Sequence, residues 1–163
     1  MNFETSKDYQ QNVSTPYYLF LLLPMMAFIW VYMEQKHRDL APALSEAWIG
    51  LVGALLGLVI IALIVFAFLY FKKQVELLRA NNSLRDKLKQ LYPLYLKFYA
   101  LLFAALSISV SAYYLTQLWY TGFAFMALVL LFSYHRPTPY KFCKDLRLPA
   151  AEKEIVMNFY AIR

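Results

Sequence analysis

The sequence predicts an all-α integral membrane protein with four transmembrane helices. Three observations support this fold class: 61% of the residues are hydrophobic, they are concentrated in long uncharged runs, and the basic residues gather in alternate connections. A soluble domain is typically about 45–50% apolar, and a helix of about 20 apolar residues crosses the hydrocarbon core of a bilayer. With four such runs in 163 residues, we expect a single membrane domain over the whole chain.

The first two spans are predicted at residues 16–33 and 47–71. Pro16 suits the first turn of a helix, where the missing N–H of proline is not needed. The segment before it carries acidic side chains and lacks the basic start of a cleavable signal. The first apolar run is therefore expected to be retained as a span.

The other two spans are predicted at residues 94–114 and 118–134, as a tight antiparallel hairpin. Only a few residues around Thr116 and Gln117 separate them. A turn at Gly122 instead would leave about 12 residues for the fourth span, which is too few to cross a bilayer. We therefore place the turn next to Gln117.

Two segments outside the spans have polar helical patterns. Residues 72–90 predict two short cytoplasmic helices, the first of which extends span two. Residues 135–163 form a cytoplasmic tail, with one short helix at 140–146 and another that starts at Pro149 and runs to about Phe159. The apolar residues of this last helix need a cover, either the membrane surface or a partner.

The distribution of basic residues predicts the topology. Lys36 and Arg38 are the only two of the 16 lysine and arginine residues that fall on one side of the four-span arrangement. Basic residues favour the cytoplasmic side of membrane proteins. Both termini are therefore expected in the cytoplasm, and the composition is typical of small multi-pass proteins of the bacterial inner membrane.

Small residues at helical spacing predict two faces on which helices pack closely. In a bilayer, helix association depends on close backbone approach, and the small-xxx-small pattern permits it. The predicted helix-packing residues are Gly50, Gly53, Gly57, Ala100, Ala104, Ser107 and Ser111.

The sequence offers little chemistry for catalysis. No Asp or Glu lies inside a predicted span, and Cys143 is the single cysteine, which excludes an intrachain disulfide. We therefore predict no enzyme activity, no cofactor and no metal. The acidic loop between the first two spans, with Glu34, His37, Asp39 and Glu46, is better explained by solvated charge than by a metal site.

We expect the protein to be a non-catalytic subunit or scaffold of a larger membrane complex, bound to other membrane proteins or to itself. A homo-oligomeric channel is the alternative, and a lipid-acting membrane enzyme is the third. The candidate pore-lining residues are Ser107, Ser109, Ser111, Thr116 and Gln117.

The positive charge outside the spans predicts contact with the lipid bilayer rather than nucleic acid. Basic clusters next to membrane helices attract anionic lipids, and the basic segment after span two alternates with leucine rather than with aromatic side chains on which bases stack. The predicted anionic-lipid contacts are Lys72, Lys73, Arg136, Lys141 and Lys144.

Overall fold

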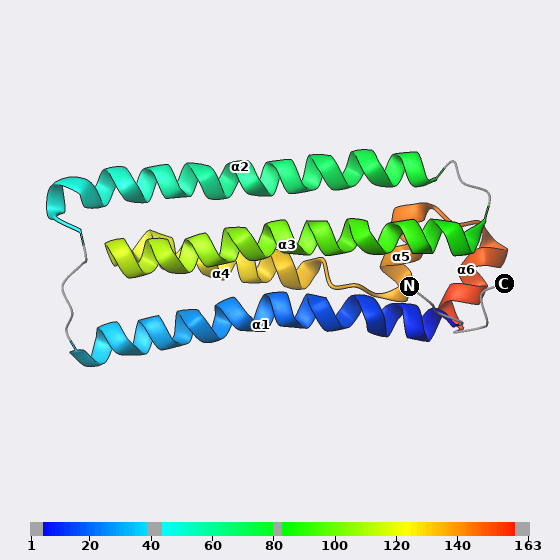
Figure 1. Ribbon diagram of the computed structural model, residues 1–163, viewed down its shortest axis with the longest axis horizontal. Helices are drawn as coiled ribbons and strands as arrows, with labels where there is room; N and C mark the ends of the chain where they lie inside the picture. The colour runs from blue at the N-terminus through cyan, green and yellow to red at the C-terminus, as the bar shows by residue number, and fades with distance from the viewer. Residues whose placement is uncertain (1–4, 39–43, 80–82, 159–163) are drawn as a thin grey trace. The chain divides into compact units, whose positions relative to one another are not determined.

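The computed structural model describes residues 5–38, 44–79 and 83–158, and these form six helices (Figure 1). The all-α prediction is confirmed for these residues. The helices are α1 (Ser6–Arg38), α2 (Glu46–Leu78), α3 (Leu84–Thr116), α4 (Trp119–Tyr134), α5 (Pro139–Leu146) and α6 (Ala150–Met157).

Three of the helices, α1, α2 and α3, are long and apolar enough to cross a membrane. Together they suggest a membrane-embedded protein. The apolar helix α4 is shorter, with 16 residues, and so measures about 24 Å at a rise of about 1.5 Å per residue. The hydrocarbon core of a bilayer is about 30 Å thick.

Helix α1 begins earlier than the sequence predicts, at Ser6 rather than at Pro16. The backbone N–H of Asp8 donates to the Thr5 hydroxyl and the N–H of Thr5 donates to the Asp8 carboxylate, each over 3.2 Å. This reciprocal pair is a capping box, which satisfies backbone donors at a helix start. The cap fixes the start of α1, and Pro16 lies within the helix.

The segment 72–90 also differs from the expectation of two short helices. Helix α2 does continue past the span to Leu78, but the second expected helix is the beginning of α3. Helix α3 continues through Pro93, whose neighbours Leu91 and Leu94 are buried. Their packing holds the helix together where proline removes one backbone donor. The expected break at Asn81 and Asn82 lies outside the described residues.

The chain divides into two compact units, which are described separately below. Unit 1 comprises Met1–Tyr18, Phe68–Tyr99 and Arg136–Arg163. Unit 2 comprises Leu19–Ala67 and Ala100–His135.

Aromatic side chains form the core of unit 1. The fully buried ring of Tyr95 on α3 lies 5.5 Å from the ring of Phe142 on α5 and 5.6 Å from that of Tyr99. Phe142 in turn meets Tyr9 of α1 edge to face, with 5.2 Å between the ring centres. Such pairs stabilise a core beyond the area that they bury. They join α1, α3 and α5.

Asp145 at the end of α5 is held by two helices. Its carboxylate accepts a 2.5 Å hydrogen bond from the Tyr95 hydroxyl. Its backbone carbonyl accepts two hydrogen bonds from the Arg79 guanidinium, at 3.0 and 2.9 Å. Hydrogen bonds with a charged partner are shorter and stronger than neutral ones. Asp145 therefore attaches α5 to α3 and to the end of α2.

The apolar face of α6 is covered in part by the chain itself. Val156 is only 1% exposed, and its carbonyl accepts a 3.0 Å hydrogen bond from the hydroxyl of Ser6. Lys87 of α3 forms a 3.3 Å ion pair with Glu152. The predicted need for a cover is thus met for Val156 within unit 1, and Phe159 lies outside the described residues.

In unit 2, stacked aromatic rings join α1 to the hairpin of α3 and α4. The rings of Phe28 and Phe125 are nearly parallel, with 4.1 Å between their centres and 7° between their planes. Phe28 also lies 5.1 Å from Tyr113 on α3. The Gln35 amide donates to the backbone carbonyl of Tyr114 over 3.2 Å. Aromatic contact therefore dominates the packing of α1 here.

The turn between α3 and α4 falls where the sequence places it, at residues 117–118. Gln117 adopts a left-handed backbone conformation, with φ of 52°. The Thr116 hydroxyl donates to the carbonyl of Ala112, and the Thr121 hydroxyl donates to that of Leu118, over 2.7 and 2.6 Å. Each bond joins a hydroxyl to a backbone carbonyl three or four residues earlier in the chain, a local bond typical of Ser and Thr.

We predict that Tyr95→Phe lowers the free energy of unfolding by about 1–3 kcal/mol, because it leaves the Asp145 carboxylate without a donor. The ring stack stays in place. Thermal unfolding in detergent measures the change, with Tyr140→Phe as control because Tyr140 is 59% exposed. Equal stability of the two variants would show that the Asp145 bond does not hold the tail.

Candidate functional site

The three glycines predicted as one packing face of α2 have different surroundings. A Cβ added at Gly53 would lie 2.8 Å from the Tyr120 hydroxyl and 3.2 Å from the Leu118 side chain. At Gly50 and at Gly57 an added Cβ would meet nothing within 4 Å. Gly53 therefore faces the start of α4 within unit 2, whereas Gly50 and Gly57 lie on an open stretch of the helix.

The predicted small-residue face of α3 is mostly half-buried or open. Ala100 and Ser111 are exposed, and Ala104 and Ser107 are half-buried. The small residues that α3 buries are instead Ala105, Ser109 and Ala112. The predicted small residues and the buried ones both follow helical spacing. Periodicity alone therefore could not show which of the two faces of α3 is buried.

The candidate pore-lining residues do not form one surface. Ser109 is buried, and its hydroxyl donates to the backbone carbonyl of Thr121 over 3.4 Å. Thr116 is also buried, while the exposed Ser111 donates to the carbonyl of Ser107 over 3.1 Å. Gln117 lies in the turn. A pore stays a prediction.

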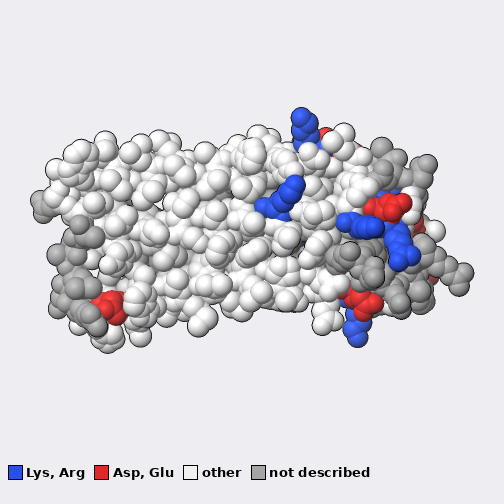
Figure 2. All heavy atoms as spheres, viewed as in Figure 1, with Lys and Arg blue, Asp and Glu red and all other residues white. Residues whose placement is uncertain are grey.

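The predicted anionic-lipid contacts all belong to unit 1. On the face that Figure 2 shows, the visible Lys and Arg side chains lie over unit 1. The visible surface of unit 2 is mostly uncharged on the same face. Lys72, Lys73, Arg136 and Lys144 are exposed. The Arg136 guanidinium lies 5.7 Å from the centre of the Tyr18 ring, a cation–π distance.

Helix α5 places one lysine and the cysteine in less polar surroundings. Burial lowers the pKa of the Lys141 ammonium; the Asp145 carboxylate opposes this shift and Lys144 adds to it. The Cys143 thiol is free and buried, and burial raises its pKa although the charge of Lys153 opposes the shift. A thiol with a raised pKa has little thiolate, which is the reactive form.

The structure brings no metal-binding cluster together among the residues that it describes: no group of three His, Cys, Asp or Glu side chains there is suited to hold a metal ion. Of the acidic loop, Asp39 and the side chain of Glu46 lie outside the description.

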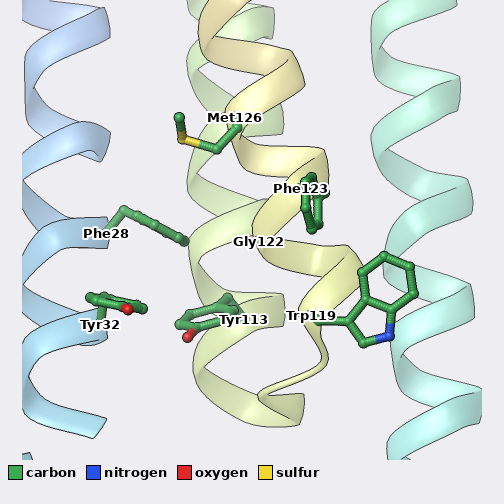
Figure 3. Close-up of a pocket in the computed structure, with 7 residues that line it drawn as sticks. All are labelled: Phe28, Tyr32, Tyr113, Trp119, Gly122, Phe123 and Met126. Atoms are coloured by element: carbon green, nitrogen blue, oxygen red, sulfur yellow. The ribbon is translucent and has the colours of Figure 1, made fainter. Parts of the chain in front are cut away.

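Unit 2 contains a pocket that the sequence did not predict, with a volume of about 310 Å³ (Figure 3). Its walls come from α1, α3 and α4. They are formed by Phe28, Tyr32, Tyr113, Trp119, Gly122, Phe123 and Met126. Pockets for small molecules are typically about 300–1,000 Å³ and mainly apolar, so this one lies at the small end of that range.

The polar atoms of the pocket lie toward one end. Figure 3 shows the Tyr32 and Tyr113 hydroxyls and the Trp119 indole at a similar level, near the end of α3 and the start of α4. Phe123 and Met126 lie further along α4, away from that end. Gly122 leaves space: a Cβ added there would meet the Tyr113 ring at 3.6 Å, an ordinary contact.

Comparison of the chain with known protein families, curated proteins and solved structures finds no match.

We predict that Gly53→Leu destabilises the chain itself by about 1–3 kcal/mol, the usual cost of overpacking. The new side chain would displace Tyr120, which is 40% exposed and has room to move, so the lower end of that range is expected. Thermal unfolding of the monomer in detergent measures the effect. Gly50→Leu is the matched control, because a Cβ added there meets nothing within 4 Å. Equal melting temperatures for the two variants would contradict the contact with α4.

Proposed function

We propose that this protein is a non-catalytic subunit of a larger membrane complex, and that α2 is the helix that meets its partner. The observation that carries this proposal is the open surface around Gly50 and Gly57. These two residues are seven positions apart, so they lie close to the same face of the helix. Ala54 lies near that face and is exposed as well.

The burial of the long helices supports the choice of α2. In its most apolar 18-residue window only 17% of the residues are buried, compared with 22% for α1 and 44% for α3, so α2 is the least buried of the three, though only slightly less than α1. Large side chains such as Leu51, Leu58 and Ile61 are more than half exposed. An apolar helix with open glycines permits a second helix to approach its backbone closely, which is the main source of helix association in lipid.

Within this proposal the protein crosses the bacterial inner membrane four times, with both termini in the cytoplasm. Support comes from the basic residues at the unit 1 ends of α2 and α3. The fourth crossing is made by α4, whose shorter length is compatible with local thinning of the bilayer.

Labelling with a membrane-impermeant thiol reagent in intact cells tests this topology. In a Cys143→Ser background, Lys36→Cys is expected to react from outside, whereas Ser83→Cys and Arg136→Cys react only after the membrane is opened. All three side chains are exposed in the structure. Outside reactivity of Arg136→Cys would show that α4 does not cross, and outside reactivity of Ser83→Cys would remove the crossing by α2.

Assembly is tested by Gly57→Leu, which blocks close approach to α2 without a clash inside the chain. In native membranes solubilised with mild detergent, wild-type protein is expected to copurify with other membrane proteins. The variant should lose most of this material, since overpacking by about 1–3 kcal/mol weakens association about tenfold for each 1.4 kcal/mol.

Ala62→Leu is the matched control, because Ala62 is exposed on a different side of α2. It should copurify like the wild type, and all three proteins should insert in the membrane and melt at similar temperatures as monomers. A wild-type protein that is strictly monomeric and free of partners would contradict the proposal.

A further inference from the structure

The pocket of unit 2 has the properties of a site for one lipid chain. Its walls are aromatic rings, a methionine and the backbone of Gly122. At its mouth, Trp119 is 73% exposed and Phe123 is 68% exposed. Trp119 and Phe123 belong to the shorter apolar helix α4, in a chain whose three long apolar helices suggest a membrane-embedded protein. Hydrocarbon is therefore the expected surrounding of the mouth.

Water is a poor occupant of such a space. A buried water needs two to four polar partners, and apolar cavities of about 150 Å³ stay dry. An empty pocket leaves its wall atoms without dispersion contacts on one side. The hydrocarbon that surrounds a membrane helix supplies those contacts directly, and methionine adapts well to flexible apolar ligands.

The polar end indicates how the lipid lies. The hydroxyls of Tyr32 and Tyr113 are grouped at the level of the α3–α4 turn (Figure 3). Tyrosine and tryptophan prefer the membrane interface, where one end of the side chain is apolar and the other is wet. The ester carbonyls of a glycerolipid lie at the same depth and accept hydrogen bonds.

We propose that this pocket binds one acyl chain of a bilayer glycerolipid. The chain lies along Phe28, Phe123 and Met126, and the ester carbonyl accepts a hydrogen bond from the hydroxyl of Tyr32 or Tyr113. This site goes beyond the proposed subunit function and does not depend on it, because none of the pocket walls belongs to α2.

Fluorescence quenching tests the site in reconstituted full-length protein. The chain has three tryptophans, so Trp30→Phe with Trp48→Phe leaves Trp119 as the only emitter. The vesicles contain an ether-linked phosphatidylcholine, which has no ester carbonyl to accept from Tyr32 or Tyr113, and a small fraction of ester-linked phosphatidylcholine with a brominated acyl chain, which quenches at short range. A selective site gives more quenching of Trp119 than the mole fraction of brominated lipid predicts.

Bromine close to the ester should quench Trp119 more strongly than bromine near the methyl end, because Trp119 lies at the polar end of the pocket. If the quenching in the protein with an unchanged pocket only follows the mole fraction of brominated lipid, Trp119 contacts ordinary surrounding lipid. That result alone would overturn the proposal, and no pocket variant is needed for it.

Gly122→Leu blocks the pocket and is expected to lower the excess affinity for lipid about tenfold, equivalent to about 1.4 kcal/mol. The matched control Ala62→Leu, on α2, should keep it. Undiminished excess quenching in Gly122→Leu would place the lipid elsewhere. Should Gly122→Leu fail to fold, Tyr32→Phe with Tyr113→Phe removes both hydroxyls with little change of volume. Loss of the excess quenching by the ester-linked lipid supports the proposed hydrogen bond, and its retention contradicts the proposal.

Discussion

Every backbone polar group within the hydrocarbon of a bilayer must find its hydrogen-bond partner inside the protein. This constraint explains most of the helical architecture of the chain. It favours long continuous helices, including α3, which runs on through Pro93. It also determines where small hydroxyls point. Thr15 donates to the carbonyl of Gln11 and Thr116 to that of Ala112, each within its own helix. These two hydroxyls are thus used within their own helix, whereas Ser109 and Gln35 each donate to a backbone carbonyl of a neighbouring helix.

The two units pack their helices in different ways. Unit 2 uses stacked rings and close approach at Gly53, with few polar contacts between its helices. Unit 1 buries aromatic rings as well, but it adds charge-assisted bonds at Asp145 and at the pair of Lys87 and Glu152. Such bonds suit surroundings where water reaches the charged groups, since an isolated charge in hydrocarbon is costly. The tail helices α5 and α6 are therefore attached by a combination of burial and ion contacts that the spans cannot use.

Hydropathy and the length that a helix needs to cross a bilayer were sufficient to predict the apolar helices and the turn next to Gln117, because both are properties of the apolar runs themselves. The start of α1 was missed because a capping box at Thr5 outweighs the preference of Pro16 for a first turn. The sequence could not predict the different surroundings of Gly53 and Gly57 either, because both lie on one side of the helix and only the positions of Leu118 and Tyr120 distinguish them. The pocket needs the relative register of α1, α3 and α4, which no local pattern encodes.

The open face of α2 and the proposed lipid pocket lie on different helices of unit 2, so the two proposed sites are separate. Sites that share no residues and no contacting neighbours contribute to stability independently. A partner that packs on Gly57 therefore need not displace a lipid held by Phe28 and Met126, and a bound chain fills the pocket without cost to the partner. If a lipid instead altered the affinity of the partner, Leu118 and Tyr120 offer the direct route, because both lie against Gly53 on α2 and both are chain neighbours of the pocket residue Trp119. The variants Gly57→Leu and Gly122→Leu, combined in one chain, separate these cases. Additive effects on assembly and lipid binding indicate independent sites, and a coupling energy above about 0.5 kcal/mol indicates a connection between them.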